Sequence, residues 1–136
     1  HPSINVSNNR MNYTFDDPGE ALAMTTMFAA NHTNGVKAIV ALTESGTTPL
    51  LMSRLSSGLP IYALSSNSQT LSYCALYRGV TPVKFNSTTT DSIEFVNNAL
   101  QTLKDADYLK EGDVILLTHG DDINEGSTNT CKIITI

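Results

Sequence analysis

Short apolar runs, bounded by glycine, proline or small polar residues, recur along the chain. They are rich in valine, isoleucine and leucine and are too short for helices, so they predict β-strands, most of them buried on both faces. The strands are expected at residues 36–42, 61–64, 80–85, 114–118 and 130–136.

Between these runs, apolar residues recur at helical spacing, which predicts helices. The helices are expected at residues 17–34, 49–57, 69–77 and 91–109. Asp17 followed by Pro18 is typical of a helix start, and Gly35 is typical of a helix end. Thr89 or Thr90 is expected to cap the last helix. The apolar face of that helix is predicted to hold Ile93, Val96, Leu100 and Leu103.

The alternation of helix and strand predicts a three-layer α/β/α sandwich around a five-stranded, mostly parallel sheet. Pro82 lies in the 80–85 strand and lacks a backbone donor, so this strand is expected at an edge of the sheet. The 118–129 connection has no helical pattern, so the last strand is predicted to be antiparallel. Residues 1–15 show no sustained period and are interpreted as a linker or arm, and residues 16–136 as one domain.

The composition and net charge of the chain argue against some classes of function. The chain has 136 residues, of which 40% are hydrophobic and 15% charged, as expected for a globular domain. Its net charge of −5 and the absence of a basic run argue against nucleic acid and anionic membranes as partners. Two cysteines without metal-ligand spacing are expected to be free, buried thiols, which favours a reducing, cytoplasmic location.

One turn combines glycine with several hydroxyl residues directly after a predicted strand. It consists of Thr43, Glu44, Ser45, Gly46, Thr47 and Thr48. In an open α/β sheet, such a turn aims backbone N–H groups and a helix N-terminus at a ligand, and glycine permits close approach. The pattern predicts a site for phosphate or another small anion. The alternative is a plain tight turn in which Thr47 or Thr48 caps the next helix.

A competing interpretation of the turn is that the protein is a hydrolytic enzyme. Its catalytic triad would consist of Ser45, His119 and Asp121. The sequence around Ser45 lacks the G-x-S-x-G pattern of a nucleophile elbow, which argues against this interpretation.

Three motifs carry a family resemblance. They are T-x-S-G-x-T at residues 43–48, L-x-R-G-V-x-P at residues 76–82 and G-S-T-N-T at residues 126–130. Together with the sequence around them, they resemble the C-terminal domain of pyruvate kinase, most closely the bacterial type that sugar or nucleoside monophosphates activate. Nearly the whole chain shares this similarity, and the 1–15 arm resembles the segment that follows the catalytic barrel.

The resemblance implies a role in regulation rather than catalysis. In the family, phosphoenolpyruvate, ADP, Mg²⁺ and K⁺ are bound by the barrel and lid domains, so the isolated domain is expected to carry no catalytic residue and no cofactor. The effector phosphate is implied to lie in the 43–48 turn. A loop is implied to close over it, formed by Gly120, Asp121, Gly126, Ser127 and Thr128.

Two departures from the family pattern favour a monophosphate effector. Many relatives carry Arg or Lys where this chain has Thr47, and Glu44 adds a negative charge beside the turn. Nothing between Phe85 and Ile93 resembles the Trp and Arg with which some relatives hold the second phosphate of fructose bisphosphate. A weak site of millimolar to submillimolar affinity is therefore expected.

Self-association is the second implied role. The resemblance implies a tetramer in which C-terminal domains contact each other, and the last strand could pair with its copy in a second chain. The predicted interface residues are Cys131, Ile133 and Thr135. The alternative is a domain that serves only in oligomerisation and whose effector turn is vestigial.

Overall fold

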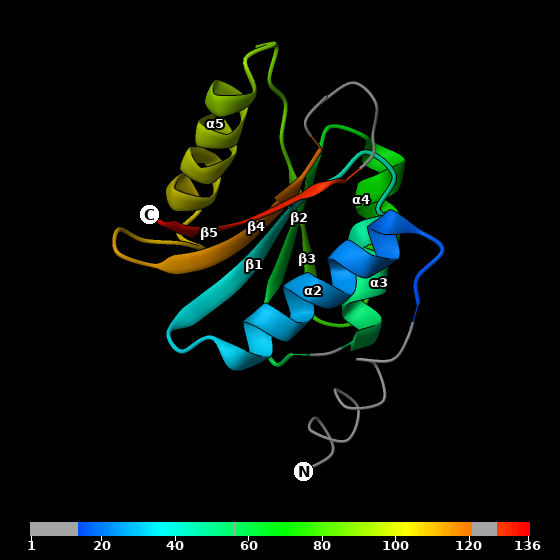
Figure 1. Ribbon diagram of the computed structural model, residues 1–136. Helices are drawn as coiled ribbons and strands as arrows, with labels where there is room; N and C mark the ends of the chain where they lie inside the picture. Colours follow the sequence, from blue (N-terminus) through cyan, green and yellow to red (C-terminus); the bar gives the residue numbers. More distant parts are fainter. Residues whose placement is uncertain (1–13, 56, 121–127) are drawn as a thin grey trace.

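The computed structural model describes residues 14–55, 57–120 and 128–136. Helices and strands alternate along these residues, as predicted (Figure 1). Their order is α2 (Pro18–His32), β1 (Val36–Leu42), α3 (Thr47–Leu55), β2 (Ile61–Ser65), α4 (Ser68–Cys74), β3 (Val80–Lys84), α5 (Ser92–Asp105), β4 (Val114–His119) and β5 (Thr130–Thr135).

The five strands form one sheet in the order β3-β2-β1-β4-β5. The pairs β1–β2, β1–β4 and β2–β3 are parallel, whereas β5 runs antiparallel to β4. The predicted direction of the last strand is therefore confirmed, and so is the edge position of the strand that contains Pro82.

Helices cover both faces of the sheet, which confirms the three-layer sandwich. Figure 1 shows α2, α3 and α4 on one face and α5 on the other. One apolar cluster packs α2, α3 and α4 against the sheet through Ala23, Met27, Met52 and Cys74. The other packs α5 through Val96, Ala99, Leu100 and Leu103.

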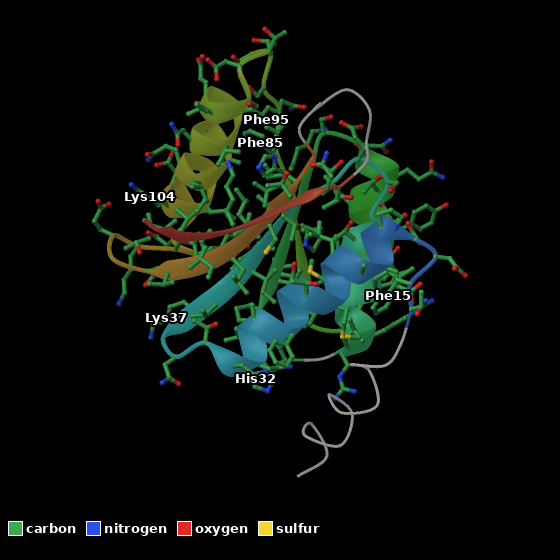
Figure 2. All side chains as sticks on the ribbon, in the orientation of Figure 1. Phe15, His32, Lys37, Phe85, Phe95 and Lys104 are labelled. Atoms are coloured by element: carbon green, nitrogen blue, oxygen red, sulfur yellow. The ribbon has the colours of Figure 1, made fainter. Side chains whose placement is uncertain are left out.

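An aromatic pair holds the first turn of α5 against the end of β3. The rings of Phe85 and Phe95 meet edge to face with centroids 5.1 Å apart, and Figure 2 shows them near the same end of α5. The Phe85 N–H also donates to the Ser65 carbonyl at 3.0 Å, which continues the pairing of β2 with β3.

The bounds of α5 differ from those predicted. Asp91, rather than Thr89 or Thr90, is the N-cap, because its Oδ1 accepts the N–H groups of the first turn. Ile93 is 72% exposed, so its predicted place on the apolar face that packs against the sheet is wrong. The helix ends at Asp105 instead of residue 109, shortly before Asp107 adopts a left-handed φ of 62°.

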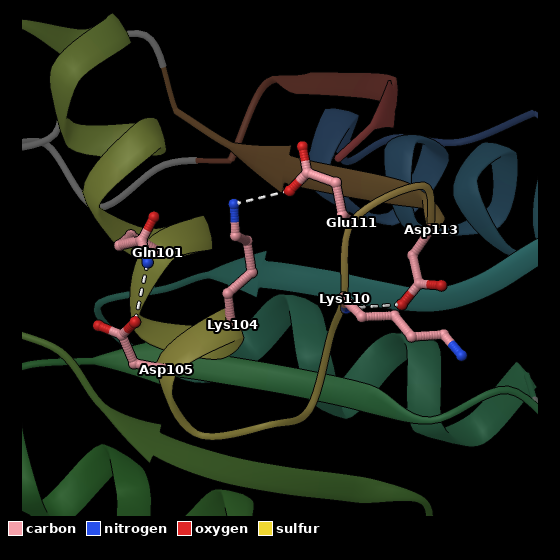
Figure 3. Close-up of polar contacts among 6 residues, drawn as sticks. All are labelled: Gln101, Lys104, Asp105, Lys110, Glu111 and Asp113. Carbon is pink, nitrogen blue, oxygen red and sulfur yellow. Dashed lines mark hydrogen bonds and ion pairs between the residues drawn. The ribbon is translucent and has the colours of Figure 1, made fainter.

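The segment from α5 to β4 is held by polar contacts at the amino-terminal edge of the sheet (Figure 3). Lys104 Nζ and Glu111 Oε2 form an ion pair at 3.1 Å. The backbone N–H of Lys110 donates to Asp113 Oδ2 at 2.9 Å and closes the turn before β4. These contacts position the start of β4, which lies next to β1 in the sheet.

Candidate functional site

The predicted turn lies where the strand order of the sheet reverses. The chain passes from β1 to β2 and β3 on one side and then returns to place β4 on the other side of β1. Ala41 pairs with Thr118, so the 43–48 turn after β1 begins beside Gly120 at the end of β4. A crevice outside the carboxyl ends of strands at such a reversal is the usual ligand position in open α/β sheets.

Hydroxyl groups shape the turn from within. Thr43 Oγ1 accepts the Gly46 N–H at 2.9 Å. Ser45 Oγ accepts the Thr47 N–H at 3.3 Å and lies 3.0 Å from Thr47 Oγ1. The side chains of Glu44, Ser45 and Thr47 are exposed, so the outer rim of the turn is open to a ligand.

Helix α3 begins within the turn, two residues earlier than predicted. The Gly46 carbonyl accepts the Leu50 N–H at 3.2 Å, and Thr47 and Thr48 are the first two helical residues. The alternative in which Thr47 or Thr48 serves as the cap is therefore wrong. Pro49 fits in this first turn because the missing N–H would have no partner within the helix.

Three backbone donors of the turn remain available within the described part of the chain. No described residue accepts a hydrogen bond from the N–H groups of Glu44, Ser45 and Thr48. An anion is the natural partner for such donors beside a helix N-terminus.

Sequence reasoning missed the support of the turn by α4. Thr70 Oγ1 donates to the Glu44 carbonyl at 2.5 Å, across 26 residues of sequence. Cys74 is fully buried beneath Gly46, and burial raises the pKa of its thiol above the ordinary value. This thiol therefore stays protonated and a poor nucleophile at neutral pH. No local signal could have linked these residues to the turn, because only the packing of α4 brings them there.

His119 and Ser45 do not meet as a catalytic pair. His119 is 5% exposed, and its Nδ1 donates to the Gly120 carbonyl at 2.8 Å. Its Nε2 has no partner among the described residues. Ser45 Oγ is engaged with Thr47, and Asp121 lies outside the described residues. The arrangement gives the hydrolytic interpretation no support.

The implied loop is only partly described. Gly120 follows β4 and Thr128 precedes β5, and both are partly buried. Asp121, Gly126 and Ser127 lie outside the described residues.

The predicted interface residues all lie on β5, at one edge of the sheet. Ile133 is 62% exposed, which is unusual for an isoleucine in a strand. Both thiols are free, but Cys131 is only partly buried, so the prediction of a buried thiol is right for Cys74 and wrong for Cys131.

Other parts of the described chain do not add to this site. A cavity of about 540 Å³ lies at the amino-terminal ends of the strands, away from the 43–48 turn. It is lined by the end of α3 and the starts of β2 and β3. The residues in the described ranges contain no group of three acidic, histidine or cysteine side chains that could hold a metal ion. None of the helices within these ranges has the length and hydropathy to cross a membrane.

Comparison with known proteins identifies the family. Residues 20–134 match the family described as pyruvate kinase, alpha/beta domain. The chain is 51% identical over 136 residues to pyruvate kinase II of Salmonella typhimurium and 49% identical over 137 residues to the pyruvate kinase of Haemophilus influenzae. A pyruvate kinase of Buchnera aphidicola is 46% identical over 136 residues. Each match covers 99% of this chain but 28% of the relative's length. The chain thus belongs to the pyruvate kinase family and corresponds to its C-terminal α/β domain.

Proposed function

We propose that this domain binds the phosphate of a sugar or nucleoside monophosphate in the 43–48 turn and thereby regulates a pyruvate kinase. The transfer of a phosphoryl group from phosphoenolpyruvate to ADP, with its Mg²⁺ and K⁺, would take place in other domains. An effector acts on such an enzyme only if it binds two states of the protein with different affinity.

The observation that carries the proposal is the start of α3. Glu44, Ser45 and Thr48 present N–H groups without an acceptor in the described structure, at the positive end of a helix dipole and at the strand-order reversal. The hydroxyls of Ser45 and Thr47 lie on the exposed rim and share one hydrogen bond, so whichever of them accepts that bond can donate to a ligand as well.

The same residues favour weak binding of a single phosphate. Thr47 offers no charge, whereas a charge-assisted contact would contribute about 1.5–3 kcal/mol, or about ten- to hundredfold in affinity. Glu44 adds a negative charge. We therefore expect a dissociation constant in the millimolar to submillimolar range.

Isothermal titration with ribose 5-phosphate and AMP tests this proposal. Heat of binding should disappear in Ser45→Ala and persist in Ser57→Ala. Ser57 is a matched control because its Oγ accepts the N–H two residues ahead, at 3.1 Å, as Ser45 Oγ does. Tight, saturating binding of fructose bisphosphate would contradict the expectation of a monophosphate.

We also propose that the domain self-associates through β5. This strand pairs only with β4 among the described strands, so its other edge has no strand partner within the described residues. Pairing with its copy about a two-fold axis would cover that edge and the exposed Ile133.

Sedimentation velocity of two isoleucine variants tests this second role. Ile133→Lys should shift the protein toward the monomer, whereas Ile93→Lys on α5 should not, although Ile93 is 72% exposed and Ile133 62%. A dimer that binds neither ribose 5-phosphate nor AMP would favour the alternative of an oligomerisation module with a vestigial turn.

A further inference from the structure

Thr70 of α4 is tied to the turn through its side chain and to its own helix through its backbone. It is 4% exposed, and its Oγ1 donates to the Glu44 carbonyl at 2.5 Å. Its N–H donates to Oδ1 of Asn67, the N-cap of α4, at 3.2 Å. The hydroxyl therefore projects from a fixed point of the backbone.

The contact with the Glu44 carbonyl also determines the direction of the next N–H. The Glu44 carbonyl and the Ser45 N–H belong to one peptide plane, and in a trans peptide they point in opposite directions. The described residues contain no cis peptide bond. Because Thr70 holds the carbonyl toward α4, the Ser45 N–H points away from α4, where no described residue accepts it.

Gly46 brings the turn into direct contact with the same helix. Its φ is +81°, and a Cβ at this position would lie 3.4 Å from Thr70 Cγ2 and 3.3 Å from Cys74 Sγ. The Thr70 side chain therefore supports two consecutive parts of the turn, with its hydroxyl on the Glu44 carbonyl and its methyl group beneath Gly46.

We propose that Thr70 is a positioning residue of the anion site: its hydroxyl holds the Glu44–Ser45 peptide so that the Ser45 N–H faces the phosphate. This inference rests on the proposed function of the turn. Thr70 itself is buried beneath the turn and does not contact the ligand.

The test compares three variants by titration with ribose 5-phosphate. Thr70→Val keeps the shape and the methyl contact but removes the donor, and should weaken binding about five- to twentyfold, as expected for a lost hydrogen bond that orients another one. Thr70→Ser keeps the donor and should bind within about twofold of the unaltered protein.

Ser53→Ala is the matched control. Ser53 Oγ donates to the Arg78 carbonyl at 2.7 Å across 25 residues, which is the same kind of bond at the opposite end of α3. This variant should lose stability and keep its affinity. If Thr70→Val does not fold, Thr70→Cys, whose thiol is a weak donor, takes its place.

A second readout follows the peptide itself. In ¹⁵N-resolved NMR spectra of the ligand-free protein, Thr70→Val should shift the Ser45 amide, and Thr70→Ser should leave it nearly unchanged. Equal affinities of Thr70→Val and the unaltered protein, or equal losses of affinity in Thr70→Val and Ser53→Ala, would overturn the proposed role of Thr70. Neither result would overturn the proposed function of the turn. No binding by the unaltered protein would overturn the proposed function, and this inference with it.

Discussion

Helices α3 and α5 both begin at the carboxyl edge of the sheet, yet their first turns use their backbone donors differently. At α5, Asp91 Oδ1 accepts the N–H groups of Ile93 at 2.9 Å and Glu94 at 3.2 Å. At α3, the Thr43 and Ser45 hydroxyls accept the N–H groups of Gly46 and Thr47, but no described residue accepts the N–H groups of Glu44, Ser45 and Thr48. The start of α5 carries its own anion, Asp91, whereas the start of α3 has backbone donors without a described acceptor, where we propose that a phosphate binds.

The two helix starts also differ in their acidic residues. Glu94 lies in the first turn of α5, where it suits the helix dipole, but the first turn of α3 contains no acidic residue. The comparison teaches that a helix N-terminus is closed to a ligand where a neighbouring carboxylate accepts its N–H groups, as at α5, and open to one where none does, as at α3.

The largest effect is expected at Gly46. An alanine there must adopt a φ of +81° and pack 3.3 Å from Cys74 Sγ, so Gly46→Ala should lose about 2–4 kcal/mol of unfolding free energy. Gly58→Ala is the control, because Gly58 has a φ of +78° with no atom near the added Cβ, and it should lose about 1–2 kcal/mol. Urea unfolding measures both. Equal losses would show that the added Cβ fits between the turn and α4 without strain.

Removal of the α5 cap should affect stability alone. Asp91→Ala leaves two N–H groups without their acceptor and should cost about 1 kcal/mol. Its affinity for ribose 5-phosphate should not change, whereas Ser45→Ala should show the reverse pattern, with little loss of stability and no binding. Thermal unfolding and titration of both variants measure the two effects, and a shared pattern would contradict the proposed division of roles.

The charges near the two helix starts should differ in their effect on binding. Glu44→Gln removes a negative charge beside the proposed phosphate and should strengthen binding about two- to fivefold at low salt, as expected for an exposed charge pair worth up to about 1 kcal/mol. Glu94→Gln should leave affinity unchanged and cost a few tenths of a kcal/mol through the dipole of α5. Weaker binding by Glu44→Gln would argue that the phosphate does not bind in this turn.

The smallest effect is expected at the other end of α5. The ion pair of Lys104 with Glu111 shown in Figure 3 is exposed on the Glu111 side, where the side chain is 82% accessible. Lys104→Ala should therefore lose less than about 0.5 kcal/mol and leave ligand binding unchanged. A loss comparable to that of Asp91→Ala would mean that this ion pair stabilises α5 as much as the cap does.

Most of the fold could be predicted because its signals are local. Buried strands appear as apolar runs, Pro82 marks an edge, and Asp17 with Pro18 marks a helix start that the structure confirms, since Asp17 Oδ1 accepts the Gly19 N–H. The errors arose where local signals compete. Threonine and aspartate are both good caps and stand next to each other before α5, and the left-handed Asp107 ends that helix without a glycine.

The site could be predicted only in outline. Hydroxyls and a glycine after a strand indicate the turn. That β1 and β4 are neighbours could not be predicted, because it depends on the strand order of the folded sheet. The support from Thr70 lies 26 residues away, and only the packing of α4 reveals it. Likewise, the two cysteines look alike in sequence and differ in burial because Cys74 faces the sheet and Cys131 lies on the edge strand.

The strand order also matters while the chain is being synthesised. Only α3 separates β1 from its neighbour β2 along the chain, but its other neighbour, β4, appears only after α5. Until then, β1, in which every residue except Lys37 is buried in the finished fold, has one open edge, and such edges invite wrong pairing. β4 and β5 are therefore the last strands to join the sheet beside β1. Only then does the 43–48 turn have the end of β4 next to it.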